Sequence, residues 1–202
     1  MRIISTTLIA IVSATAISSQ PTPEVPEIVL EPAPVEEVAK EVTMVDRWIL
    51  PGANYNESRV LEALQDRGIT DRAALATVMG NIKQESRFIS NICEGGARIN
   101  YWSCTRGGYG LIQWTTHRRY RGLWAHSQRM GLNPESVEAQ ISYLFTEPEW
   151  RGIESSLRIG GRSIQYYMNR AYFWLGWGHH GYRTEYSWDY YNRLTIKSVP
   201  AK

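Results

Sequence analysis

A glycine-rich stretch in the middle of the chain limits the possible folds more than any other feature. Between Asn91 and Trp114 the sequence follows no helical period, and it has glycine at positions 95, 96, 107, 108 and 110. This composition is typical of a loop or a short hairpin. Amphipathic helical patterns stand on both sides, and no alternating apolar pattern is long enough for a large sheet. We therefore predict a mainly helical, α+β fold with one small glycine-rich region.

Six helices are predicted from apolar spacing and from capping residues. In the second of them, Leu75, Val78, Met79 and Ile82 follow the spacing of one helix face. Asn133 followed by Pro134 is a cap with a proline in the first turn. The predicted helices are 56–67, 70–85, 116–130, one that begins at Asn133 and includes 137–145, 163–174 and 184–194.

The first 46 residues differ in composition from the rest of the chain. They hold two of its 22 basic residues, seven of its 20 acidic residues and five of its nine prolines. A positive start, a short apolar run and Ala14-Thr15-Ala16 predict a signal peptide at 1–16, or else an N-terminal anchor in contact with a membrane. Residues 17–46 are predicted to form an acidic, proline-rich linker. The predicted catalytic domain is 47–202.

Glu85 lies where the apolar stripe of the second predicted helix reaches its C-terminal end. The stripe passes through Leu75, Val78 and Ile82 to Glu85 in steps of three, four and three residues. Burial and the negative end of the helix dipole both raise the pKa of a carboxyl group there. A carboxylic acid still protonated near neutral pH is what general-acid catalysis requires. The alternative is a solvated glutamate, or one paired with Arg87.

Two motifs stand on either side of the loop. The segment NIKQESRF, from Asn81 to Phe88, is followed by GGYGLIQWT, from Gly107 to Thr115. This pair resembles the phage tail lysozyme family, within the wider group of goose-type lysozymes and soluble lytic transglycosylases. The resemblance covers about 69–194 and includes an Arg-x-x-Tyr step that begins at Arg183. It implies a lysozyme-like helical domain whose glycine-rich region forms a substrate cleft.

The resemblance implies a peptidoglycan glycosidase that cleaves the β-1,4 bond between N-acetylmuramic acid and N-acetylglucosamine. Glu85 then matches the catalytic acid, and Gln113 matches a cleft residue that contacts substrate. Aromatic side chains can stack on sugar faces, although core packing is the alternative for each of them. The further candidates for substrate contact are Ser86, Tyr109, Gly110 and Trp114, with Trp102 as an additional aromatic.

A second carboxylate would decide between two reactions. Hydrolysing glycosidases usually have two carboxylates, whereas transglycosylases use one glutamate and let the 6-hydroxyl of the sugar attack. Glu94 is the nearest candidate because it lies in the loop between the motifs, and Glu185 and Asp189 are later ones. A solvated loop charge is the alternative for Glu94. Hydrolysis and 1,6-anhydro product formation both stay open.

Cys93 and Cys104 stand at the two ends of the same loop. An even number of cysteines in a chain with an export signal favours a disulfide. The alternative makes Cys104 the nucleophile of a cell-wall amidase or peptidase, with His179 or His180 as its base. The four histidines do not follow a zinc-binding pattern, so neither a metal nor a cofactor is predicted.

The charge of the predicted domain favours an anionic partner. Residues after position 46 carry the basic excess, with a cluster at Arg118, Arg119 and Arg121. For an exported protein, that partner is the anionic polymers of the cell wall rather than a nucleic acid. We expect a secreted, periplasmic or virion-associated protein that acts on peptidoglycan glycan strands. The alternative is a non-catalytic module that binds peptidoglycan or builds a virion or envelope. The sequence specifies neither an oligomeric state nor a phage or bacterial origin.

Overall fold

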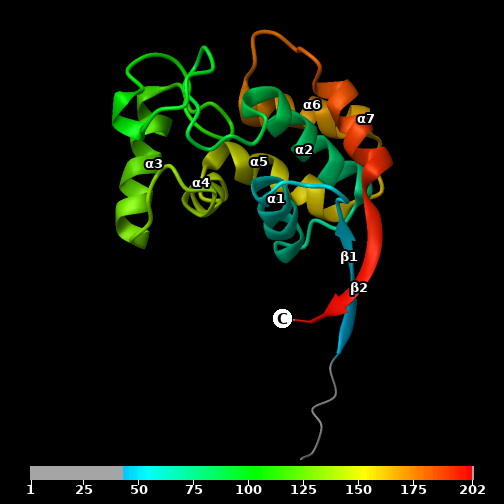
Figure 1. The fold of residues 1–202 in the computed structure, drawn as a ribbon. Helices are drawn as coiled ribbons and strands as arrows, with labels where there is room; N and C mark the ends of the chain where they lie inside the picture. Colours follow the sequence, from blue (N-terminus) through cyan, green and yellow to red (C-terminus); the bar gives the residue numbers. More distant parts are fainter. Residues whose placement is uncertain (1–42, 202) are drawn as a thin grey trace, which may run out of the picture. The chain divides into compact units, whose positions relative to one another are not determined.

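The computed structural model describes residues 43–201 (Figure 1). The predicted signal segment, and the predicted linker as far as residue 42, lie outside the described residues. The prediction of a mainly helical α+β fold is confirmed, because the described part has seven α-helices, one short 3-10 helix and one pair of strands. In chain order they are β1 (Met44–Ile49), α1 (Tyr55–Asp66), α2 (Arg72–Ser86), the 3-10 helix Tyr101–Ser103, α3 (His117–Met130), α4 (Val137–Leu144), α5 (Pro148–Ile159), α6 (Ile164–Leu175), α7 (Arg183–Arg193) and β2 (Thr195–Pro200).

Helix α2 is the central element of the described part. It contacts α1, α5, α6 and α7, and Figure 1 shows it surrounded by these helices. Its residues from Ala73 to Ile82 are buried without a break, so both the apolar stripe and the opposite face are covered. A helix that is covered all round has a fixed position. Its C-terminal end is therefore a rigid place from which to present a side chain.

Strands β1 and β2 pair antiparallel, with Met44 opposite Pro200 and Ile49 opposite Thr195. The pair leads away from the helices in Figure 1. The first three residues of β1 fall within the segment for which a linker is predicted. Neither strand was predicted from the sequence, because the two pairing segments are about 150 residues apart and each is too short for a clear alternating pattern.

The observed helix boundaries differ from the predicted ones mainly at the caps. A capping side chain must accept a hydrogen bond from a backbone amide two or three residues further along. Asp71 does so for α2, where its Oδ1 accepts from the amide of Ala74 at 2.9 Å. The observed caps of α1, α2 and α4 are Asn54, Asp71 and Ser136, where the sequence analysis indicated Asn56, Thr70 and Asn133.

Helix α5 was not predicted, although its signals are present in the sequence. Pro148 occupies the first turn, and Trp150, Ile153 and Leu157 are buried at helical spacing. The helix packs against α6, where the Trp150 and Trp174 rings meet edge to face with centroids 5.1 Å apart. None of the helices within residues 43–201 has both the length and the apolar character needed to cross a membrane.

Candidate active site

A close approach between α2 and α7 brings two distant segments together. A Cβ atom on Gly80 would lie 2.5 Å from the backbone nitrogen of Ser187 and 2.8 Å from its Cα, so the helices touch where Gly80 has no side chain. Ser187 in turn donates a hydrogen bond to the carbonyl of Arg183, at 2.7 Å. One turn from this contact, Arg183 on α7 lies beside Glu85 on α2. The glycine therefore sets the distance between the two charged side chains.

Glu85 and Arg183 form a largely buried ion pair. Arg183 Nη2 donates to Glu85 Oε1 at 2.6 Å, and the side chains are 5% (Arg183) and 16% (Glu85) exposed. The guanidinium group also lies over the ring of Trp177, 4.6 Å from its centroid. The alternative partner considered from the sequence, Arg87, is exposed and forms no ion pair among the described residues. Glu85 is therefore neither solvated nor paired with its neighbour.

Burial raises the pKa of Glu85, as its position on the apolar stripe predicted. The positive charge of Arg183 lowers this pKa, and the charge of Arg119 adds a smaller effect in the same direction. Burial has the larger effect, so the pKa of Glu85 stays above the ordinary value for a glutamate. Burial also lowers the pKa of Arg183, which its contact with Glu85 opposes. The site thus favours a protonated Glu85 more than a solvated helix end would.

A cleft of about 700 Å³ lies between the end of α2 and the glycine-rich loop. Glu85, Ser86, Glu94 and Gln113 all line it, so the structure brings four of the predicted site residues together. Gln113 adopts a positive φ of 53°, and its side-chain amide donates to the carbonyl of Gly110 at 2.9 Å. The predicted loop region therefore does form one wall of a cleft next to the candidate acid.

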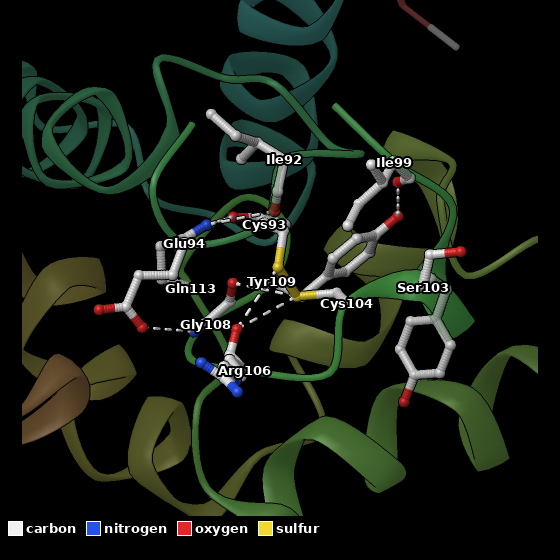
Figure 2. Close-up of a disulfide and its surroundings, with 12 residues drawn as sticks. Ile92, Cys93, Glu94, Ile99, Ser103, Cys104, Arg106, Gly108, Tyr109 and Gln113 are labelled. Carbon is white, nitrogen blue, oxygen red and sulfur yellow. Dashed lines mark hydrogen bonds between the residues drawn. A yellow bond between two sulfur atoms is a disulfide. The ribbon is translucent and has the colours of Figure 1, made fainter. Parts of the chain in front are cut away.

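The disulfide between Cys93 and Cys104 fixes the loop that carries Glu94 (Figure 2). The prediction of this disulfide is confirmed. Cys104 therefore has no free thiol, and its role as a nucleophile is excluded in this structure. Figure 2 also shows that the Glu94 carboxylate points to the backbone of Gly108, whose amide donates to Glu94 Oε2 at 3.1 Å. The amide of Glu94 donates to the carbonyl of Gly108 at 2.8 Å.

Gly107 makes room for the Glu94 carboxylate. A Cβ atom at Gly107 would lie 2.5 Å from Glu94 Cδ, and the φ of 71° suits glycine. The sequence alone does not reveal this role of Gly107. Gly110 has a similar one, because a Cβ atom there would lie 2.5 Å from Gln140 Oε1. Gly110 therefore faces a buried glutamine, and it does not line the cleft.

Ser86 and Gln140 hold the GGYGLIQWT turn in place from two sides. Ser86 is 2% exposed and donates to the carbonyl of Leu111 at 2.8 Å. Gln140 is fully buried on α4, and its Oε1 accepts from the amide of Leu111 at 2.8 Å. Ser86 thus joins the acid-bearing helix to the turn. Gln140 was not predicted from the sequence. It is distant from the turn along the chain and comes close to it only in the folded structure.

Tyr109 and Trp114 belong to the core. Both are 0% exposed, and neither lines the cleft. The Tyr109 hydroxyl donates to the carbonyl of Ile99 at 3.1 Å, and Trp114 Nε1 donates to Glu147 Oε2 at 3.0 Å. Neither ring offers a face to a sugar. Both rings pack in the core, which was the alternative to substrate contact. Trp102 is 60% exposed, but it too lies outside the cleft lining.

The predicted basic cluster on α3 is not one charged surface. Arg119 is buried, and its Nε and Nη2 donate to the two carboxylate oxygens of Glu147 at 2.7 and 2.8 Å. Arg118 pairs with Glu149 but is itself exposed, as is Arg121. The inference from sequence neighbours was wrong for Arg119, since adjacent helical residues point in different directions.

The later candidates and the histidines lie apart from the cleft lining. Asp189 pairs with Lys83 and Arg193, and Glu185 is exposed on α7. His126 is buried against Ser142, at 2.8 Å, while His179 and His180 are exposed. Within residues 43–201 no three His, Cys, Asp or Glu side chains are placed to hold a metal ion.

The chain matches a known protein family over the segment that contains the site. A family model described as phage tail lysozyme matches residues 55–173, which is more than half of the chain. The matched range includes Glu85, Glu94, Gln113 and the disulfide, and it ends before Arg183. No curated protein and no solved structure matches the chain. With the acid, the cleft and the turn all inside the matched range, the chain belongs to the phage tail lysozyme family.

Proposed function

We propose that the protein cleaves the β-1,4 bond between N-acetylmuramic acid and N-acetylglucosamine in peptidoglycan, with Glu85 as the general acid. The observation that carries the proposal is the position of Glu85: largely buried, with a raised pKa, and on the wall of a cleft of about 700 Å³. Cleavage of a glycosidic bond requires a proton on the leaving oxygen. Membership of the phage tail lysozyme family supports the same class of reaction.

The contact with Arg183 assigns different tasks to the two oxygens of Glu85. Oε1 accepts from Arg183 Nη2, so it is the unprotonated oxygen. Oε2 has no hydrogen bond to any described residue, so it carries the proton and delivers it to the glycosidic oxygen. Once the proton has left, Glu85 is a carboxylate, and the Arg183 charge stabilises it. The same carboxylate can then take a proton from the attacking hydroxyl group.

The attacking group is either water or the 6-hydroxyl of the sugar itself. Glu94 is the second carboxylate on the described cleft wall, held by the Gly108 amide. If it assists catalysis, it stabilises the oxocarbenium-like centre or positions water, and the product is a reducing sugar. If Glu85 acts alone, attack by the 6-hydroxyl gives a 1,6-anhydro sugar. Mass spectrometry of digested peptidoglycan distinguishes the two products.

Substitution of Glu85 by glutamine tests the proposal. Glutamine keeps the shape of the side chain but cannot supply the proton, so clearing of a purified cell-wall suspension should slow by at least about a hundredfold. Glu185→Gln is the matched control, because Glu185 is an exposed carboxylate on α7 outside the cleft lining. Full activity in a correctly folded Glu85→Gln protein would rule out Glu85 as the acid. Glu94→Gln, assayed on the same walls, measures the part played by the second carboxylate.

An exported location suits this function. A disulfide persists in oxidising compartments, and peptidoglycan lies outside the cytoplasmic membrane. We propose a secreted, periplasmic or virion-associated protein, with residues 1–16 as its export signal or anchor and the segment from 17 to the start of β1 as a linker. The anionic polymers of the wall would be its further partners.

A non-catalytic module that binds peptidoglycan is the second candidate, and the Arg183 contact favours it. An arginine at 2.6 Å stabilises the ionised form of Glu85, which cannot donate a proton. A wall pull-down that retains the protein without releasing reducing ends or anhydro-sugars would support this candidate over the enzyme.

A further inference from the structure

A second hollow continues the cleft beyond the end of α2. It has a volume of about 310 Å³ and shares Arg87, Ile89 and Arg98 with the cleft, so the two spaces meet across these three side chains. We call this second space the side hollow. Its remaining lining comes from the start of α1 and from the turn after α2: Asn54, Tyr55, Asn56, Phe88, Ser90 and Asn91.

The side hollow carries two positive charges and no acidic lining residue. Arg87 and Arg98 are both exposed. Neither has a carboxylate within 4.0 Å among the described residues, in contrast to Arg118, Arg119 and Arg183. The nearby acidic side chain of Glu138 bonds the Tyr55 hydroxyl, at 2.7 Å. Two guanidinium groups without an acidic partner therefore line the junction between the spaces.

The backbone beneath both arginines is fixed. Arg87 ends α2 with a φ of 51°, in the left-handed region where glycine is favoured. Phe88 after it is buried, and its carbonyl accepts from Asn56 Nδ2 at 2.7 Å. Arg98 pairs through its backbone with Ile92, next to the disulfide. Both guanidinium groups are therefore attached to backbone that is held in place beside the junction of the two spaces.

We propose that the side hollow binds the acidic stem peptide of the glycan strand in the cleft, with Arg87 and Arg98 holding its carboxylates. This rests on the proposed function, because the peptide is attached to the sugars that the cleft would hold. A guanidinium group matches a carboxylate in shape and charge. The asparagine and serine groups of the lining suit the amides of a peptide backbone. The residues thus determine specificity for stem-bearing strands.

The experiment compares two substrates, three variants of the two arginines and one control variant. Purified glycan strands that carry stem peptides are compared with the same strands after the stems have been removed by an amidase. In Arg87→Gln and in Arg98→Gln, kcat/KM on stem-bearing strands should fall about fivefold, and in the double variant about twentyfold. On bare strands, which still pass the cleft wall that Arg87 and Arg98 share, kcat/KM should fall by less than about twofold. Arg121→Gln removes one exposed positive charge outside both hollows and should match the wild type on both substrates.

Binding gives a readout that does not depend on cleavage. The Glu85→Gln protein, with and without the two arginine substitutions, is titrated with both kinds of strand. The two arginine substitutions together should weaken binding of stem-bearing strands about twentyfold and binding of bare strands by less than about twofold. Equal weakening on bare strands, or no change on either substrate, would overturn the inference about the side hollow. Persistent cleavage by Glu85→Gln would instead overturn the proposed function and leave the binding comparison valid.

Discussion

Replacement of Gln140 by leucine tests whether this buried side chain holds the cleft wall in place. Gln140 accepts from the amide of Leu111 at 2.8 Å and donates to the carbonyls of Ser90 and Pro134, at 2.6 and 2.9 Å. Leucine has a similar size but makes none of these bonds. The amide of Leu111 is fully buried, and leaving it without a hydrogen-bond partner should lower the free energy of unfolding by about 2 kcal/mol. The two carbonyls lie in half-buried residues and can bind water instead, so the loss of each of these hydrogen bonds should lower the free energy of unfolding by only about 0.5 kcal/mol.

The free energy of unfolding of Gln140→Leu should therefore fall by about 3 kcal/mol, measured by urea denaturation with an unchanged slope. Wall-clearing activity should fall as well, because the turn that Gln140 holds carries Gln113 into the cleft. Gln128→Leu on α3 is the control, since Gln128 is exposed, and it should change stability by less than about 0.5 kcal/mol. A loss below about 1 kcal/mol with full activity in Gln140→Leu would refute the reasoning.

Three further changes give separate readouts. In Arg183→Gln the pKa of Glu85 should rise further, because a charge that lowers it is removed. Since the acid must be protonated, the alkaline limb of the kcat–pH profile should move to higher pH by about one unit or more, and a move to lower pH would contradict this. Reduction of the disulfide should lower the free energy of unfolding by about 3 kcal/mol in urea, and an unchanged midpoint would count against the closed loop. Gly107→Ala should displace the Glu94 carboxylate. If Glu94 takes part in catalysis, Gly107→Ala should reduce wall-clearing activity as much as Glu94→Gln does. Unequal losses of activity would show that the two substitutions do not act through the same carboxylate.

The sequence predicted the parts of the fold that depend on local spacing. Six of the seven helices in the described part, and the position of Glu85, follow from apolar periodicity and capping residues. Thr116 and Ser163, at which two of the predicted helices begin, cap α3 and α6. Helix α5 was missed although its apolar spacing is regular. Its cap position, Glu147, makes no capping bond, because its carboxylate is occupied by Arg119 and Trp114. The sequence therefore offers Pro148 as a start signal, but no Ser, Thr, Asn or Asp at the cap position.

The candidate site was predictable where a motif carries it and not where tertiary contacts do. Glu85, Glu94 and Gln113 lie in or between two motifs close in sequence, and all three line the cleft. Tyr109 and Trp114 belong to the second motif, but their rings are buried by tertiary contacts, Tyr109 against Tyr101 and Tyr120 and Trp114 against Tyr143. Sequence spacing does not show which face of a loop the helices will cover.

The pairing of β1 with β2 has a consequence for the order in which the protein folds. The helices form from contacts mostly near in sequence, whereas Met44 meets Pro200 only after a loop of about 150 residues has closed. During synthesis β1 leaves the ribosome early and has no partner until the last strand follows. An unpaired strand edge of this kind is prone to join other chains. A chain that ends before Thr195 lacks β2 but keeps every helix, and it should therefore aggregate more during refolding.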